Sequence, residues 1–249
     1  MEAEEYARLD ETEAQHWWFA AVHRLVRDAL CRPERPRARP ILDAGCGTGG
    51  LLARLEAACP DAALLGLDLS AAALDRARAK TRAVLVRASV DALPYADRTI
   101  GAIVSIDVLC HRAVDPARAL DEFRRVLAPG GILLMNMPAH RWLRSVHDDR
   151  VHNRGRYASG EIRDMLAAAR FDAIDVHHWN SLPFPALLLQ RKLLAPLARG
   201  PARSDVAPLP GPLDRCLRAV MAVERAMIRA GLRLPFGGSI FAVARKAAP

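Results

Sequence analysis

One stretch of the sequence constrains the fold more than any other: a short apolar run that enters a glycine-rich turn. Residues 41–50 are Ile-Leu-Asp-Ala-Gly-Cys-Gly-Thr-Gly-Gly, and an apolar helical pattern follows at 51–58. Glycine permits positive φ angles and lets a ligand approach the backbone closely. A strand, a glycine turn and a helix in this order are typical of the first unit of a nucleotide-binding sheet, and Gly45, Gly47 and Gly50 satisfy the GxGxxG pattern.

The residues after this turn repeat the alternation of strand and helix. The apolar letters of each strand are continuous rather than alternating, which predicts parallel strands that are buried on both faces. A ligand is then expected at the carboxyl ends of the strands, where the strand order reverses. Strands are expected at 41–44, 63–68, 83–87, 100–106 and 132–136, and helices at 71–80 and 116–127, followed by helix 159–169, strand 172–178, helix 213–230 and strand 239–246.

Composition narrows the class of protein further. The 249 residues, 51% of them hydrophobic, are enough for a core that needs no disulfide or metal. The formal charge of +8 comes mostly from Arg residues that are scattered along the chain, so no nucleic-acid partner is expected. The N-terminus is acidic where a signal peptide would be basic, and no apolar run of about 18 residues occurs. We therefore expect a cytoplasmic protein without a transmembrane segment.

The cysteines do not form a recognisable framework. They are odd in number, far apart and include no CxxC pair, so neither a zinc knuckle nor a disulfide scaffold is expected, and no metal site is predicted. The five are Cys31, Cys46, Cys59, Cys110 and Cys216.

Two carboxylates indicate which nucleotide the turn would hold. Asp68 ends the second expected strand, where it suits ribose hydroxyls in a nicotinamide or an adenosyl cofactor alike. Asp43 precedes Gly45 by two positions, and a carboxylate there would repel a pyrophosphate. The turn is therefore better suited to a cofactor that carries a cation.

Five blocks in order resemble the class I S-adenosylmethionine-dependent methyltransferases, most closely the methyltransferase type 11 family. This resemblance implies an α/β, Rossmann-like seven-stranded sheet of order 3-2-1-4-5-7-6 with strand 7 antiparallel, an N-terminal helical cap and a helical insert before the last strand. It also implies S-adenosyl-L-methionine as the cofactor. The blocks are LDAGCGTG (42–49), GLDLS (66–70), SVDALPYAD (89–97), IVSIDVLCH (103–111) and FRRVLAPGG (123–131).

The same resemblance implies roles for residues of the first two blocks. The backbones of Gly45 and Gly47 would pack against the methionine part of the cofactor, and Asp43 would attract its ammonium group. Asp68 would accept hydrogen bonds from both ribose hydroxyls, and Leu69 follows it in the cofactor site.

The later blocks would contact the adenine and the methionine. Ser89 and Val90 would contact the adenine edge, with the Val90 amide as donor; Ser89 stands where an Asp is common in the family, and it accepts more weakly. Ile106 and Asp107, after the fourth strand, would border the methionine portion and the substrate mouth.

The chain is expected to be a single methyltransferase domain with three additions. A helix over 12–31, capped by Thr12, would belong to the first of them. Its Trp17-Trp18-Phe19 would either cover the cofactor or bury the helix. The parts are residues 1–37 as N-terminal helical cap and linker, 38–137 as cofactor-binding core, 138–158 as substrate loop and 180–236 as helical lid insert.

The acceptor side offers candidate bases and cations. A hydroxyl acceptor needs a base, and a carboxylate acceptor does not. His111 and His147 are the catalytic candidates because histidine titrates near neutrality. A cluster of arginines would favour an anionic acceptor if it faces the site, although genomic Arg bias explains it as well. These arginines are Arg141, Arg144, Arg150, Arg154 and Arg156.

We therefore expect methyl transfer to a small or amphipathic molecule, at a hydroxyl or carboxylate oxygen, in specialised metabolism. The alternatives are an RNA or protein methyltransferase, a non-catalytic module with the same fold, or a nicotinamide dehydrogenase. The apolar segment 183–197 would serve as a lid, as a peripheral membrane contact or in simple packing. The acceptor and the oligomeric state are not specified by the sequence.

Overall fold

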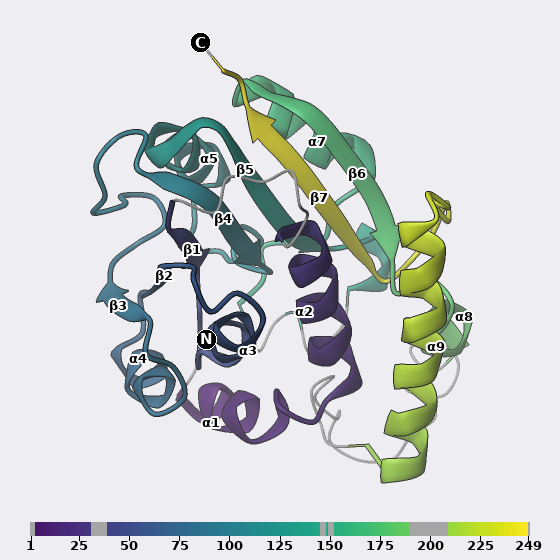
Figure 1. Ribbon diagram of the computed structural model, residues 1–249. Coiled ribbons are helices and arrows are strands. Elements are labelled where there is room, and N and C mark those ends of the chain that lie inside the picture. The colour runs from purple at the N-terminus through teal and green to yellow at the C-terminus, as the bar shows by residue number, and fades with distance from the viewer. Residues whose placement is uncertain (1–2, 31–38, 145–147, 149–151, 190–208, 249) are drawn as a thin grey trace.

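The computed structural model describes residues 3–30, 39–144, 148, 152–189 and 209–248. Within them one sheet has the strand order β3-β2-β1-β4-β5-β7-β6, which confirms the expected topology (Figure 1). β7 is antiparallel to both of its neighbours, β5 and β6. The strands are β1 (Ile41–Ala44), β2 (Leu64–Asp68), β3 (Val84–Arg87), β4 (Ile100–Ile106), β5 (Leu127–Pro138), β6 (Phe171–Trp179) and β7 (Ser239–Lys246).

Helices cover both faces of the sheet. One face buries the apolar sides of α2, α3 and α9, and the other face buries those of α5 and α7. α2 and α9 lie side by side in front of the sheet (Figure 1). The helices are α1 (Ala3–Thr12), α2 (Trp17–Leu30), α3 (Gly50–Ala58), α4 (Ala71–Arg78), α5 (Pro116–Val126), η1 (Arg141–Leu143), α7 (Ser159–Ala168), α8 (Phe184–Leu189) and α9 (Gly211–Arg229).

The N-terminal helix is not the single element expected over 12–31. α1 ends at Thr12, and α2 begins at Trp17 after a turn, so the prediction that Thr12 caps this helix is wrong. The cap comes from α9 instead: the Trp17 amide donates to Asp214 Oδ1 at 2.8 Å, across 197 positions of sequence. A tertiary contact thus supplies the hydrogen-bond acceptor for a backbone amide in the first turn of α2.

The fifth strand is longer than expected because the Pro-Gly-Gly segment belongs to it. Leu127 already pairs with Ile100, and regular pairing resumes only at Ile132 with Ala102. The residues between bulge out of the ladder, and Gly130 there has φ 74°. The Pro129-Gly130-Gly131 segment lies between the helix expected over 116–127 and the strand expected over 132–136. It is therefore part of a bulged strand rather than a connection before one.

Candidate functional site

The glycine turn is fixed between two strands at the carboxyl edge of the sheet. The amides of Gly45 and Cys46 both donate to the carbonyl of Leu67, at 2.7 and 2.9 Å. Gly45 has φ 91°, and a Cβ there would lie 2.2 Å from Cγ2 of Val108, which follows β4. The turn is therefore closed on one side by β2 and on the other by the end of β4, and it has no room for a side chain at Gly45.

Asp68 joins this turn to the next helix. Its Oδ2 accepts from the Gly47 amide at 2.9 Å, and its Oδ1 accepts from the Ser70 amide at 2.8 Å. The hydroxyl of Tyr6 is hydrogen-bonded to the side chains of Asp68 and Ser70, and burial, with the Asp68 charge, raises the pKa of Tyr6 to about 12. A neutral hydroxyl thus already contacts the carboxylate that would receive ribose hydroxyls.

The helix that carries Tyr6 covers the turn. Leu9 Cδ2 lies 3.6 Å from where a Cβ on Gly47 would be. Asp10 pairs with Arg76 at 2.9 Å, and Lys80 pairs with both Asp10 and Glu13. α1 is therefore held over the glycine turn by charges of α4 and the residues that follow it, a contact that the sequence analysis missed.

Asp43 is a buried acid. The described residues that shift its pKa are themselves acids, and no cation is among them. Its side chain lies on β1, and only 3% of the residue is exposed. Burial raises the pKa of Asp43 to about 8, and the negative charges of Asp68 and Glu13 add to this effect. Such a carboxyl group takes up a cationic ligand favourably, because the ligand supplies the missing counter-charge.

The other predicted cofactor residues lie along the same edge. Ser89 Oγ accepts from the Asp91 amide at 3.2 Å, so its hydroxyl closes a local turn, and Val90 is buried beside it. Leu69 is 59% exposed, and Ile106 is partly buried at the end of β4. The edge brings these residues together with Asp43 and Asp68, but Leu69 directs most of its surface to solvent.

Next to the glycine turn, a hydrogen-bonded chain links the ends of β4, β5 and β6. Asn136 Nδ2 donates to Asp107 Oδ1 at 2.8 Å, and Trp179 Nε1 donates to Asn136 Oδ1 at 2.7 Å. Asp107 has a positive φ of 53°. Trp18 of α2 packs against Trp179 with ring centroids 5.7 Å apart, so this part of the aromatic block lies at the carboxyl edge.

The arginines of the 138–158 segment are engaged in internal contacts. Arg156 pairs with Asp148 at 3.0 Å, and both side chains are buried, at 6% and 2% exposure. Arg154 donates to the carbonyls of Arg112 and Val114, and Arg141 pairs with Glu161. These three guanidinium groups make contacts within the protein, Arg156 in a buried pair and Arg141 and Arg154 at exposed positions. Arg150 lies outside the described residues, so the anionic acceptor stays a prediction.

The structure describes one of the two histidines predicted to act in catalysis. His111 is partly buried and forms an isolated β-bridge with Asn153. His147 lies outside the described residues, so its role stays a prediction.

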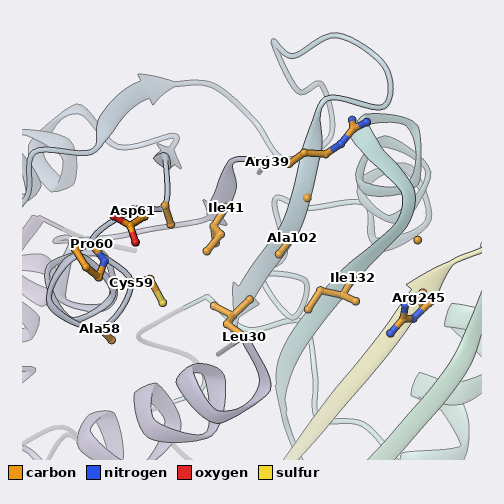
Figure 2. A pocket seen from close by; sticks show the side chains of 13 residues that line it. Leu30, Arg39, Ile41, Ala58, Cys59, Pro60, Asp61, Ala102, Ile132 and Arg245 are labelled. Atoms are coloured by element: carbon orange, nitrogen blue, oxygen red, sulfur yellow. The ribbon is translucent and has the colours of Figure 1, made fainter. Parts of the chain in front are cut away.

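A separate cavity lies at the opposite edge of the sheet. Ile41, Ala102 and Ile132 line it from the parallel strands β1, β4 and β5 (Figure 2). Arg245 lines it from the carboxyl-terminal end of the antiparallel β7, and the end of α3 also contributes. Its volume is about 120 Å³, well below the roughly 300 Å³ that small-molecule sites begin at. Its position and size do not suit a nucleoside cofactor.

Two kinds of feature are absent from the part of the chain that the structure describes. Across residues 3–30, 39–144, 148, 152–189 and 209–248, no helix has the length and apolar character needed to cross a bilayer. Over the same ranges, no three His, Cys, Asp or Glu side chains are grouped so that they could hold a metal.

The strand order, with β7 antiparallel, is that of the class I methyltransferase fold. Residues 42–135 match the model of a family described as a methyltransferase domain. The chain carries this domain and is a homologue of class I S-adenosylmethionine-dependent methyltransferases.

Similar proteins include two bacterial enzymes and one solved structure. The chain is 34% identical over 142 residues to a malonyl-[acyl-carrier protein] O-methyltransferase of Dechloromonas aromatica, which covers 55% of this chain and 53% of that one. It is 32% identical over 187 residues to a trans-aconitate 2-methyltransferase of Azoarcus sp., covering 71% and 63%. Haemonchus contortus phosphoethanolamine N-methyltransferase 2, solved with S-adenosyl-L-methionine, has the same fold, with a TM-score of 0.59, 18% identity and coverage of 90% and 52%.

The alignments leave a large part of each curated relative unmatched. The chain spans about half the length of the malonyl-[acyl-carrier protein] enzymes and 63% of the Azoarcus enzyme. The likeness therefore covers the methyltransferase domain, and the acceptor of this chain is a separate question.

Proposed function

We propose that the protein transfers a methyl group from S-adenosyl-L-methionine to an oxygen atom of a small or amphipathic molecule. One observation carries the proposal: Asp43 and Asp68 flank a glycine turn of the methyltransferase domain. Asp43 is buried with no counter-charge from the described residues, and Asp68 is bound to the turn. A cationic group of the cofactor is attracted by the ionised form of Asp43, whereas a pyrophosphate would be repelled by that form and would leave the carboxyl protonated.

The residues present suit this cofactor. The turn at Gly45 and Gly47 exposes backbone to a ligand, Asp43 would hold the ammonium group, and Asp68 would hold the ribose hydroxyls. When bound, the cofactor supplies a methyl group made electrophilic by positively charged sulfur. The protein contributes mainly by positioning the acceptor in line with that group, which can be worth roughly 7–11 kcal/mol.

The names of the relatives support a metabolite as the acceptor, and one of them supports an oxygen atom. They describe O-methylation of malonyl-[acyl-carrier protein] and methylation of trans-aconitate. The proposal is tested by incubating the protein with cofactor carrying a radiolabelled methyl group and an extract of the source cells. A labelled small molecule is the expected product. Label found only in RNA or protein, or no label transfer, would overturn the proposal.

Asp68→Ala should weaken cofactor binding by about 1–3 kcal/mol, since charge-assisted hydrogen bonds are lost. Calorimetric titration of both proteins with S-adenosylmethionine measures this difference. Asp75→Ala is the matched control, because Asp75 is exposed on α4 and pairs with Arg78 of the same helix. Equal affinities of the Asp68→Ala and control proteins would remove Asp68 from the site.

Cofactor binding should release a proton from Asp43. With a pKa of about 8 in the free protein, Asp43 is mostly protonated at pH 7, and a bound cation favours the ionised form. Affinity should therefore fall about tenfold for each pH unit below 8. Calorimetry in buffers of different ionisation enthalpy counts the protons. Asp43→Asn should release one proton fewer than the wild type at pH 7; identical counts would contradict the assignment.

A further inference from the structure

Resting on the proposed function, we propose that Asp107 is the catalytic base of the reaction and that the acceptor is a neutral hydroxyl compound, an alcohol or phenol, rather than a carboxylate. The inference starts from the hydrogen-bonded chain of Asp107, Asn136 and Trp179. From the sequence, Asp107 is expected at the substrate mouth, and no role in proton transfer is assigned to it.

Asp107 lies where the acceptor must approach the cofactor. Asp43 of β1 pairs in register with Val104 of β4, and Asp107 is three positions further toward the carboxyl edge. Val108, its neighbour, is the residue against which Gly45 packs. The Asp107 side chain is bonded toward β5, away from β1 and β2. The cofactor is therefore expected over β1 and β2, and Asp107 lies on the β4–β5 side of the same turn.

The chain behind Asp107 fixes the direction of its carboxylate. The Trp179 indole N–H is only a donor, so it requires the oxygen of the Asn136 amide to face it. The Asn136 NH₂ group is then forced toward Asp107. Asn136 and Trp179 are both 0% exposed, whereas Asp107 keeps part of its surface exposed. Two buried residues therefore orient the carboxylate of Asp107, which is the partly exposed member of the chain.

The charges around Asp107 suit proton transfer near neutrality. Burial raises the pKa of Asp107 to about 7, while the Asn136 hydrogen bond and the charge of Arg156 lower it and the charge of Asp148 raises it. The neighbouring Cys110 thiol has a pKa well above its usual value, chiefly because of burial, so it stays neutral. A base of this pKa both accepts a proton and is substantially ionised at pH 7.

The same surroundings disfavour an anionic acceptor. A carboxylate substrate would meet the Asp107 carboxylate at short range, and like charges repel. Arg156, the guanidinium whose charge acts on Asp107, is already paired with the buried Asp148. Trp18 and Trp179 pack together behind the site, so aromatic surface adjoins the site. A neutral hydroxyl acceptor avoids the repulsion and uses the base.

The step balances with these groups alone. The acceptor oxygen forms a bond to the methyl carbon, and the electron pair of the breaking carbon–sulfur bond stays on sulfur. Asp107 takes the hydroxyl proton, becomes neutral, and returns the proton to water after product release. No oxidant, reductant or metal is required.

The first test needs no variant: the radiolabelled product formed by the wild-type protein in cell extract is treated with alkali and, separately, with hydriodic acid. A methyl ester releases volatile methanol in alkali, whereas a methyl ether resists alkali and yields methyl iodide with hydriodic acid. We expect the label to be stable in alkali and to be released by hydriodic acid. Label that is volatile in alkali identifies a carboxylate acceptor and overturns this inference while the proposed function stands. Label stable to both reagents overturns it as well, and absence of any transfer overturns the proposed function and this inference together.

The second test uses Asp107→Asn, with Asp164→Asn as a control for the loss of one charge, because Asp164 is exposed on α7. Asp107→Asn should lower the label-transfer rate about 100-fold or more, with cofactor affinity and melting temperature close to those of the control. The wild-type rate should rise with pH through about 7, whereas the residual rate of the variant should not. Retention of the wild-type rate and pH profile by Asp107→Asn would overturn the assignment.

Discussion

Replacing Arg156 by methionine should lower the free energy of unfolding by about 3–5 kcal/mol, because the change removes one partner of a buried ion pair. Asp148 is 2% exposed and receives Arg156 Nε at 3.0 Å. Its other oxygen accepts from Asn153 Nδ2 at 3.2 Å, and Arg156 also donates to the Ala139 carbonyl. The ion pair links residues of the segment after β5 to one another and to the end of that strand. We therefore expect loss of the pair to destabilise the whole acceptor side of the protein.

Chemical denaturation followed by circular dichroism measures this loss. The double variant Asp148→Leu/Arg156→Met is the informative partner, because it removes both charges instead of isolating one. It should be more stable than Arg156→Met alone, since a buried ion pair that is replaced by apolar groups loses its desolvation cost as well. If Arg156→Met unfolds like the wild type, the ion pair does not hold the segment.

Gly45→Ala should impair both folding and cofactor binding. The residue has φ 91°, where a side chain costs about 1–3 kcal/mol. The new Cβ would also lie 2.2 Å from Cγ2 of Val108, and overpacking of this kind adds roughly 1–3 kcal/mol. Val108 cannot turn aside easily, because a β-branched side chain is restricted at χ1. We expect a lower melting temperature and cofactor affinity too weak to measure by calorimetry.

Gly160→Ala serves as the comparison for this variant. Gly160 lies in the first turn of α7, and a Cβ there would meet no atom within 4 Å. The substitution should leave stability unchanged or raise it by up to about 1 kcal/mol, through reduced entropy of the unfolded chain. A Gly45→Ala protein that melts and binds like Gly160→Ala would show that the turn tolerates a side chain.

Much of the fold could be predicted because local signals agree with it. The parallel strands follow from continuous apolar runs, and the caps at Ser70 and Asp115 accept backbone amides of α4 and α5 as their sequence positions predict. Asp43, Gly45 and Asp68 lie together because the glycine turn and the end of the next strand meet at one edge.

The parts that escaped prediction depend on distant contacts. α1 is short and strongly charged, and it is held by Lys80 and Arg76, far along the chain. The break before α2 is stabilised by Asp214 of α9. A usable signal existed for Asn136, because a polar residue inside the apolar run of a buried strand requires a hydrogen-bond partner. Its partners, Asp107 and Trp179, could not be assigned without the register of three strands.

The place of β7 in the sheet affects the order in which the newly made chain can assemble. This strand is formed by residues 239–246 and lies between β5 and β6, and both neighbours use it as a pairing edge. While the ribosome is still adding the residues before Ser239, β6 has no neighbour and β5 has an open side. Such unpaired edges invite association with other chains. The sheet is therefore expected to close only after residue 246 has emerged, and nascent chains stalled before that point should be prone to aggregate.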